Sequence, residues 1–480
     1  MYARVLACVA ALAVMPPTRI AAQQACPAAS TALVLSGGGA KGLAHIGVIQ
    51  ALEAAGVRPD LVVGTSMGAL VGALYAGGAT GRELDSLTRR LPLAGLFRAG
   101  APRGPVAWGA RLPLLIWEEG ERGFALQGAS IRQSSVNALL NAMLLKANLQ
   151  ARGDFDRRPI PLRVVATSRA DRSAVVIGGG DLAQAVRASV AIPLVFTPET
   201  IDGQLLTDGG LVANIPVAVA RAAGAGRVIV SDVTDLPADS LNFASPIGVV
   251  DRLLDWLFQQ PLASLHPGAL AIRSPIAGYS TLDFSGRAID SLIALGRRSS
   301  APLIAAWPCR PSADTTPAKP TTLISPVLRG VDGNVGDGDA RRIVARTLAL
   351  TDGERIDRTA LAGRLTDLGE DEVFRELWLR PTGEADTVRL SPLIRRLPRR
   401  VGGVGVAYDN ELGGMAWAGF TDRNVPVVRG EGTAILALSR YDNTLTLELR
   451  RHTLLGQRAF TPVARITALD AADVAGFRFE

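Results

Sequence analysis

A serine in a glycine-rich pentapeptide is the residue of this sequence best suited to act as a nucleophile. It stands in Gly64-Thr65-Ser66-Met67-Gly68, which is a G-x-S-x-G pattern. The apolar run LVV precedes the pattern and the small-residue run ALVGALYAGG follows it, so we expect a strand, a sharp turn and a helix. A turn of this kind exposes a serine hydroxyl at the N-terminus of a helix. The pattern also occurs by chance in glycine-rich chains, and its setting gives it weight here.

A second glycine-rich stretch, LVLSGGGAKGLAHIG, suits the binding of a phosphate or of a developing negative charge. A phosphate-binding P-loop has the pattern G-x-x-x-x-G-K-[ST], and Leu43 breaks it here. A dinucleotide-binding G-x-G-x-x-G matches formally. However, the acidic residue expected about 20 residues later would be Asp60, which precedes a strand instead of closing one.

We therefore interpret this glycine-rich loop as an oxyanion hole. Backbone N–H groups at a helix N-terminus stabilise a negative charge that develops in the transition state, and a serine nucleophile one βαβ unit later needs such donors. The residues of the predicted oxyanion hole are Gly37, Gly38, Gly39, Ala40, Lys41 and Gly42.

The serine also needs a base. None of the histidines of the chain lies in a sequence context distinctive of a Ser-His-Asp triad. There are three: His45, inside the helix expected after the glycine loop, His266, in the turn-like stretch SLHPG, and His452, in the β-rich tail. We interpret His45 as a helix-packing residue. The alternative base is a carboxylate.

Asp208 is the candidate carboxylate, in the stretch GQLLTDGGLVANIPV. It ends an apolar strand, and Gly209 and Gly210 allow other backbone segments to approach closely. An isolated Asp-Gly-Gly is more often a tight turn. The order of the three motifs along the chain favours the interpretation of Asp208 as the base.

These three motifs together resemble the patatin-like phospholipases. The resemblance implies a Ser-Asp dyad of Ser66 and Asp208, with the loop Gly37–Gly42 as the oxyanion hole. The stretches PIPLRVVATS, VRASVAIP and NIPVAVARAAGA are also similar to the family, and the likeness covers most of residues 32–307. It implies a three-layer α/β/α sandwich that hydrolyses carboxyl esters of lipids without a metal or other cofactor.

The pattern of elements agrees with an α/β domain over residues 25–307. Strands and helices alternate, which indicates a mostly parallel sheet covered on both faces. We expect strands at 31–36, 61–63, 162–167 and 227–233, and helices at 41–56, 181–190 and 216–224. The run around Trp108 and Trp117 is most simply core, and a lid or acyl-chain groove is the alternative.

The beginning of the chain predicts export. Residues 1–24 combine Arg4, an apolar run too short to span a membrane, and small residues near Ala22, as in a secretory signal peptide. Cys26 and Cys309 flank the catalytic domain in what would be an oxidising compartment, so we predict a disulfide between them. The predicted location is the outer membrane or cell surface, with the periplasm or secretion as alternatives.

The remainder of the chain divides into three parts. Residues 308–322 are rich in proline, serine and threonine and predict a linker. Residues 323–396 predict a β-α-α-β-β module, with a strand at 324–330, helices at 337–350 and 357–368, and strands near 373–379 and 387–394. Residues 401–480 alternate apolar with other residues, as in β-strands of a sandwich or of a membrane. This order resembles a POTRA module and outer-membrane barrel of bacterial patatin-like autotransporters. About 80 residues are too few for the roughly eight strands of the smallest barrels, so we expect a partial barrel or a sheet that does not close.

Composition and net charge indicate which kind of binding partner to expect. The chain has 480 residues, 48% of them hydrophobic and 20% charged, which suits packed domains rather than disorder. The net charge of +7 favours an anionic partner, and no basic run is interleaved with aromatics, so we expect a lipid surface and no nucleic acid. The chemical prediction is a lipid acyl hydrolase; a transport or assembly protein that only binds lipid, and an acyltransferase with the same dyad, are the alternatives. The sequence assigns no oligomeric state.

Overall fold

The structure is a computed structural model of the chain. It describes residues 30–91, 112–120, 123–126, 133–193, 195–234, 256, 258, 269–308, 325–332, 344, 347–370, 374–384, 386–409, 413–425, 430–439, 442–451 and 463–471. The predicted signal peptide, Cys26, Cys309, His266, His452, Trp108, nearly all of the predicted linker and most of the predicted helix at 337–350 lie outside these ranges.

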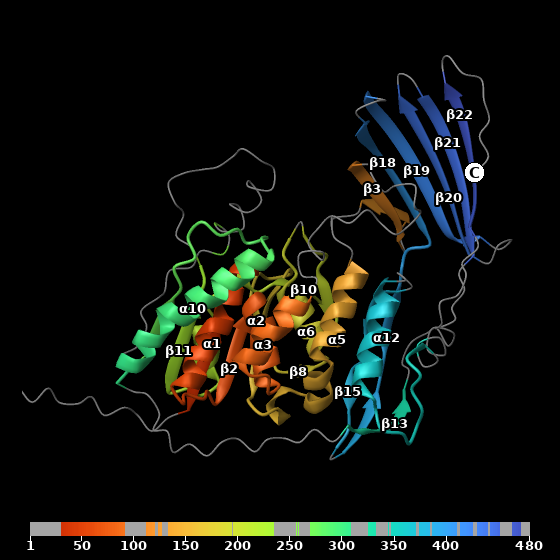
Figure 1. The fold of residues 1–480 in the computed structure, drawn as a ribbon. Coiled ribbons are helices and arrows are strands. Elements are labelled where there is room, and N and C mark those ends of the chain that lie inside the picture. Colours follow the sequence, from red (N-terminus) through yellow and green to blue (C-terminus); the bar gives the residue numbers. More distant parts are fainter. Residues whose placement is uncertain are drawn as a thin grey trace, which may run out of the picture.

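An eight-stranded sheet forms the centre of the N-terminal part (Figure 1). Its strand order is β12-β11-β1-β2-β6-β10-β9, and β7 pairs with β6 off this path. The strands from β12 to β6 are parallel, whereas β7, β9 and β10 are antiparallel to their neighbours. The mostly parallel sheet expected from the sequence is therefore present. The bounds are β1 Thr31–Leu35, β2 Leu61–Thr65, β6 Leu162–Ser168, β7 Ala174–Ile177, β9 Glu199–Ile201, β10 Gln204–Asp208, β11 Arg227–Asp232 and β12 Leu270–Arg273.

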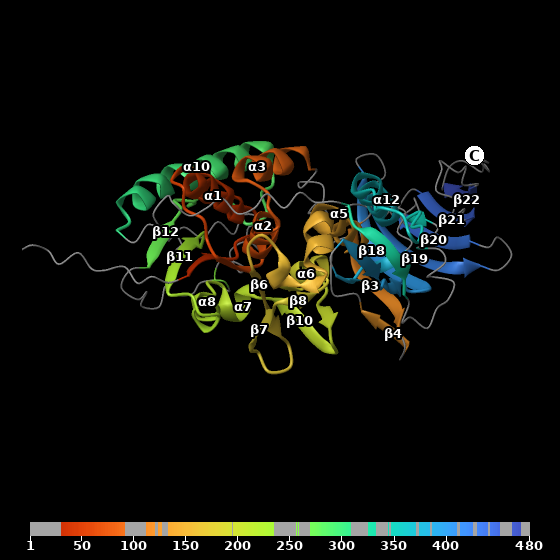
Figure 2. The ribbon, with the colours of Figure 1, turned by 90° about the horizontal axis from the view of Figure 1, so that it is seen from below.

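Helices cover both faces of this sheet, because its central strands are apolar on both sides. Leu33 and Leu35 of β1 lie in the core of one face, while Ala32 and Val34 lie in the core of the other. Figure 2 shows the resulting three layers. On the first face lie α1 Ala44–Ala54, α2 Met67–Ala76, α3 Gly81–Arg90, α5 Gln133–Ala151, α6 Leu182–Ser189 and α10 Gly286–Ala306; on the second lie α7 Gly210–Ala213 and α8 Val217–Ala222.

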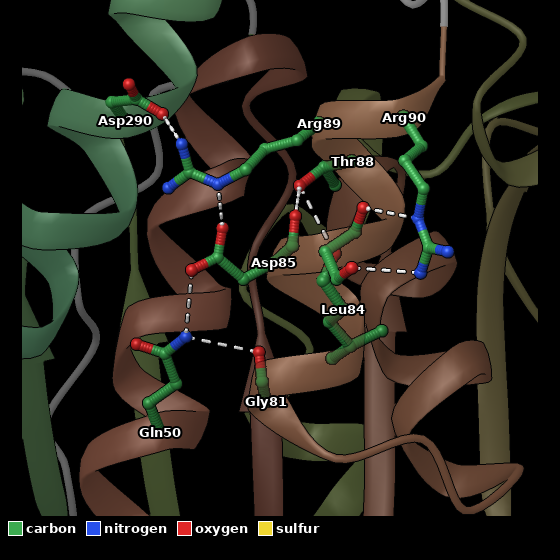
Figure 3. Close-up of polar contacts among 9 residues, drawn as sticks. Gln50, Gly81, Leu84, Asp85, Thr88, Arg89, Arg90 and Asp290 are labelled. Atoms are coloured by element: carbon green, nitrogen blue, oxygen red, sulfur yellow. Dashed lines mark hydrogen bonds and ion pairs between the residues drawn. The ribbon is translucent and has the colours of Figure 1, made fainter.

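Helix α3 is joined to α1 and α10 by polar contacts (Figure 3). Arg89 donates to Asp290 of α10 and to Asp85 one turn earlier in its own helix. Gln50 of α1 donates to the backbone oxygen of Gly81 at 3.1 Å, at the first residue of α3. These exposed and half-buried contacts set the position of α3 rather than add much stability, since surface ion pairs contribute about 0–1 kcal/mol.

A smaller module packs against α5. Its strands and helix are β13 Val327–Val331, α12 Arg358–Glu370, β14 Phe374–Trp378, β15 Pro381–Thr382, β16 Thr387–Leu390 and β17 Leu393–Arg396. The expected strand over 387–394 is two strands, since β16 joins the β13-β16-β15 sheet and β17 pairs with β14. Leu145 and Leu149 of α5 belong to the core of this module, and Trp378 of the module is fully buried in the core of the central sheet. The two cores therefore meet on α5.

The last five strands of the chain join β3 and β4 in a seven-stranded antiparallel sheet. Its order is β22-β21-β20-β19-β18-β3-β4. The strands are β3 Leu112–Gly120, β4 Gly123–Leu126, β18 Arg400–Asp409, β19 Gly413–Val425, β20 Gly430–Ser439, β21 Asp442–Arg451 and β22 Val463–Ala471. Strands β3 and β4 come from the segment that the sequence assigned to the catalytic domain. Trp117 pairs with Gly402 of β18, and Leu115 is 52% exposed, so this run extends the C-terminal sheet and is not part of the α/β core.

Large apolar side chains are exposed on one face of this C-terminal sheet. The alternation along each paired strand places them on the same side. They are Leu115, Val406, Phe420, Leu436, Leu438, Leu445, Leu447, Leu449 and Ile466, which we name the apolar face. The opposite face buries Glu431, Thr433 and Glu448. Among the helices of the described residues, none combines the length and hydropathy that crossing a membrane would require.

The remaining short elements surround the central sheet. They are η1 Gly39–Leu43, η3 Phe155–Arg157, and the two-stranded sheet of β5 Gly153–Asp154 and β8 Gly179–Gly180. Element η1 leads directly into α1, so the expected helix over 41–56 begins as a 3-10 turn.

Candidate active site

Ser66 occupies a sharp turn between β2 and α2. Its φ of 52° and ψ of −124° are unusual for a residue with a side chain, and such strain is common at functional sites. A Cβ on Gly68 would lie 2.5 Å from the backbone oxygens of Leu35 and Ser36, so only glycine fits where α2 begins. The strand, turn and helix expected around the G-x-S-x-G pattern are therefore present.

The other residues of that pattern hold the turn in place. Thr65 donates its hydroxyl to the backbone oxygen of Ala213 at 2.8 Å. Gly64 packs against the first turn of α2, where a Cβ would meet the Gly68 oxygen at 2.5 Å. Met67 is buried at the start of α2 and leaves no room for a Cβ on Gly42. These contacts fix the backbone on both sides of Ser66.

Asp208 faces Ser66 across the end of the sheet. The Ser66 hydroxyl donates to Asp208 Oδ2 at 2.7 Å, and the Gly210 N–H donates to Asp208 Oδ1, also at 2.7 Å. Ser66 is 2% exposed and Asp208 is fully buried. A Cβ on Gly209 would lie 2.2 Å from the backbone oxygen of Val165, which explains the glycine after the aspartate. The two side chains that the sequence separates by 142 residues are thus in direct contact.

Burial sets the proton affinity of Asp208. Loss of water around the carboxyl raises its pKa to about 7, and the hydrogen bonds from Ser66 and the Gly210 N–H oppose this only in part. A carboxylate with a pKa near 7 is matched to proton transfer at neutral pH. The electrostatics of the site therefore suit Asp208 as a base.

His45 is occupied elsewhere. Its Nδ1 lies 2.7 Å from the Ser231 hydroxyl and its Nε2 lies 2.9 Å from the Ser36 backbone oxygen. Burial lowers the pKa of His45 to about 4, so the ring is neutral near pH 7. Both ring nitrogens are therefore engaged in hydrogen bonds, one with the Ser231 side chain and one with the Ser36 backbone beside the glycine loop. This agrees with the interpretation of His45 as a packing residue.

The glycine loop lies beside the nucleophile. A Cβ on Gly37 would lie 3.1 Å from the Ser66 Cβ. Three of the N–H groups in the loop already have acceptors: that of Gly37 donates to Asn214, that of Ala40 to the Thr281 oxygen and that of Lys41 to the Gly38 oxygen. Within the described ranges, no acceptor contacts the N–H groups of Gly38 and Gly39. Gly38 and Gly39 are therefore the candidate oxyanion donors of this loop, since the N–H groups of Gly37, Ala40 and Lys41 are already engaged. Gly42 packs against Met67.

Two contacts at the site were not anticipated from the sequence. Ser66 donates its backbone N–H to the Ser189 hydroxyl at 2.8 Å. The Asn214 side chain accepts from the Gly37 N–H at 3.1 Å and donates to the Phe258 oxygen at 2.8 Å. Both residues lie in stretches that resemble the family, VRASVAIP and NIPVAVARAAGA, which was the only sequence signal available for them.

The family model for patatin-like phospholipases matches residues 33–221. This range starts in β1 and ends in α8, and it contains the glycine loop, Ser66 and Asp208. These residues are therefore similar to the patatin-like phospholipases, and we name the α/β part of the chain that contains them the patatin-like domain. The domain accounts for most of the described central sheet and leaves the module and the C-terminal sheet outside the match.

Similarity to individual proteins is confined to the same part of the chain. An uncharacterised NTE family protein of Mycobacterium tuberculosis is 32% identical over 228 residues, which are 45% of this chain and 52% of that protein. The lysophospholipase NTE1 of Saccharomyces cerevisiae is 29% identical over 280 residues, 53% of this chain and 15% of that protein. The chain thus spans about half the length of the first curated relatives that it matches, and much less of the yeast protein.

Among solved structures, VipD from Legionella pneumophila is similar at 15% sequence identity, with a TM-score of 0.36 over 58% of this chain and 67% of that one. A likeness of this size does not establish a shared fold.

Proposed function

We propose that the chain is a serine hydrolase of lipid carboxyl esters, of the phospholipase A or lysophospholipase type. The observation that carries the proposal is the buried 2.7 Å hydrogen bond from Ser66 to Asp208, whose pKa is raised to about 7. The match to the patatin-like phospholipase family and the similarity to a lysophospholipase support a lipid ester as the substrate.

The proposed reaction has two halves. In the first, Asp208 accepts the Ser66 proton as the Ser66 oxygen attacks the ester carbonyl carbon, and the N–H groups of Gly38 and Gly39 stabilise the oxyanion. The tetrahedral intermediate collapses, the protonated Asp208 gives its proton to the departing alcohol, and an acyl-Ser66 ester remains. In the second half, Asp208 accepts a proton from water, the water oxygen attacks the acyl carbon, and the fatty acid leaves as Ser66 regains its proton.

Substitution of each member of the proposed pair tests the function. We expect Ser66→Ala and Asp208→Asn each to abolish hydrolysis, as measured by mass spectrometry of the lipid products, with the fold retained. The double variant should be little worse than either single one, because residues that act as a unit have non-additive effects. A His45→Gln variant that stays folded should keep its turnover. Near wild-type turnover in Asp208→Asn would disprove the role of Asp208.

Two other functions make different predictions in the same assays. A transport or assembly protein would bind lipid, and Ser66→Ala would change nothing. An acyltransferase would pass the acyl group from Ser66 to an added alcohol, so the mass spectrum would contain a new ester instead of a free fatty acid. A pKa near 7 would let Asp208 activate either water or an alcohol at neutral pH, so we favour hydrolysis because of the similarity to a lysophospholipase.

The C-terminal sheet suits contact with lipid. It exposes the apolar face to solvent and buries Glu431 and Glu448 on the opposite side. The opposite side also buries Trp417, Ile435 and Ala437, so it combines polar and apolar residues. The exposed apolar face nevertheless resembles the lipid-facing side of strands in membranes. We therefore propose that the apolar face meets the acyl region of a membrane. Export to the outer membrane or cell surface, the POTRA character of residues 323–396 and the Cys26–Cys309 disulfide remain predictions of the sequence.

A further inference from the structure

Ser189 contacts the backbone of Ser66 and of Gly209, the residue that follows Asp208. It is the last residue of α6 and is fully buried. Its hydroxyl accepts the Ser66 N–H at 2.8 Å and donates to the backbone oxygen of Val165 in β6. Its own backbone oxygen accepts the Gly209 N–H at 3.3 Å. One serine thus links the nucleophile turn, the neighbouring strand and the loop that follows the base.

The Ser66 turn needs an acceptor at this point. Ser66 is the residue before the first turn of α2, so its N–H has no carbonyl of that helix to donate to. A buried N–H without a partner is unfavourable, and the left-handed φ of Ser66 adds strain. The Ser189 hydroxyl satisfies the N–H and is itself oriented by donating to Val165.

The same contacts position the base. The residues after Ser189 lead to Ala191, whose backbone oxygen accepts both the Asp208 N–H at 3.0 Å and the Thr207 hydroxyl at 2.7 Å. The end of α6 and the turn that follows it therefore hold the backbone of Ser66 and of Asp208 at once. A shift of this segment would change the distance between the Ser66 oxygen and the carboxylate.

We propose that Ser189 is a positioning residue for the hydrolysis, and this inference rests on the proposed function. It holds Ser66 in the conformation in which the hydroxyl donates to Asp208, and it takes no proton itself. Loss of its hydroxyl displaces the nucleophile relative to the base and the oxyanion donors. Because a small misplacement of reacting groups is costly, we expect Ser189→Ala to lower kcat about 10- to 100-fold.

The matched control is Ser300→Ala. Ser300 is also a fully buried helix serine, but its hydroxyl donates only to backbone oxygens of its own helix α10, with Gly296 at 2.7 Å. Both variants remove one buried hydroxyl, so both should lower the melting temperature. Only Ser189→Ala should affect the nucleophile.

The experiment measures kcat and KM of the full chain on a short-chain p-nitrophenyl ester, together with the rate at which a fluorophosphonate labels Ser66. Ser189→Ala should reduce kcat and the labelling rate while KM stays within about twofold and the midpoint of the pH profile does not move, since the hydroxyl positions and does not titrate. Ser300→Ala should keep wild-type kcat and labelling. Ser189→Cys, which retains the size but forms a weaker hydrogen bond, gives an intermediate kcat and covers the case in which Ser189→Ala does not fold.

Two results would overturn the inference: a folded Ser189 variant with wild-type kcat and labelling, or an equal loss of kcat in Ser300→Ala. Failure of the proposed function is recognised separately. It would appear as hydrolysis that survives Ser66→Ala, whatever the Ser189 variants do.

Discussion

At the residue scale, the proposed reaction can activate Ser66 only when Asp208 has lost its proton. The base must be ionised, and burial raises its pKa to about 7. We therefore expect kcat/KM to rise tenfold per pH unit below pH 6, to pass its half-maximum near pH 7 and to level off above pH 8. The pH dependence of ester hydrolysis between pH 5 and 9 measures this. A half-maximum near pH 4 would mean that the group being titrated is not a buried carboxyl.

The same carboxyl makes a prediction about stability. The pKa of Asp208 is about 7 in the folded chain and about 4 in an unfolded one. Its contribution is therefore fully present below pH 4 and is lost as the pH rises through 7, because the folded state then has to ionise a buried group. Asp208→Asn removes that cost.

We expect the melting temperature of Asp208→Asn relative to the wild type to be higher at pH 8 than at pH 5. Thermal unfolding of both proteins at the two pH values checks this. A difference that is the same at both pH values would argue against a raised pKa.

At the scale of elements, α6 joins the patatin-like domain to the module. Asp181 caps this helix by accepting the Gln184 N–H at 2.9 Å, and its other oxygen accepts from Asn148 and from the Arg380 N–H of the module, both at 2.8 Å. The far end of the same helix carries Ser189. The module therefore helps to hold the helix that contacts the nucleophile.

Asp181→Ala should destabilise the chain by about 2–4 kcal/mol, since it removes a cap and leaves two further donors without an acceptor. Thr80→Ala is the control: Thr80 caps α3 at the surface, and its loss should cost about 1 kcal/mol. Urea unfolding of the full chain measures both. Equal effects of the two variants would mean that the contact with the module adds nothing.

The packing of elements also sets where the α/β domain ends along the chain. Composition placed the division at residues 308–322, where the chain changes character. Packing places it later, because Trp378 is fully buried in the main core and donates to the buried Glu199 at 3.2 Å. A chain that ends near Trp307 would lack this side chain and expose Leu145 and Leu149 of α5.

At the scale of the whole molecule, the apolar face departs from the surface of a soluble protein more than any other surface of the described residues. Nine large side chains share it, whereas scattered single exposures are ordinary. Contact with acyl chains would remove them from water. We expect the full chain to float with phospholipid vesicles in a density gradient and to stay bound in high salt, since salt weakens only electrostatic attachment.

Leu436 and Leu445 lie directly opposite each other on β20 and β21, and Leu436→Ser with Leu445→Ser should reduce vesicle binding at least tenfold. The control variant carries Leu205→Ser and Leu303→Ser, which change similarly exposed leucines outside the C-terminal sheet. Both pairs should hydrolyse a water-soluble ester at the wild-type rate. Unchanged binding of the first pair would show that the membrane contact lies elsewhere.

The sequence by itself determined which residues are candidates for the site and the order of the main elements. The reason is that each motif is local: a glycine-rich turn, a serine between a strand and a helix, and an aspartate that ends a strand each depend on neighbouring residues. The β1, β2, β6 and β11 strands were likewise visible as apolar runs. The pairing of Ser66 with Asp208 was implied by the resemblance to the patatin-like phospholipases, and the structure places the two side chains in contact.

Only the tertiary structure decided which residues support those motifs. The contact of Ser189 with Ser66, the engagement of the Gly37 N–H by Asn214 and the burial of Trp378 all join segments that are distant in the chain. The insertion of β3 beside β18 is a further case, because an apolar alternating strand fits several sheets and its residues do not name the partner. Such choices depend on how whole faces pack together, and no short stretch of sequence contains that information.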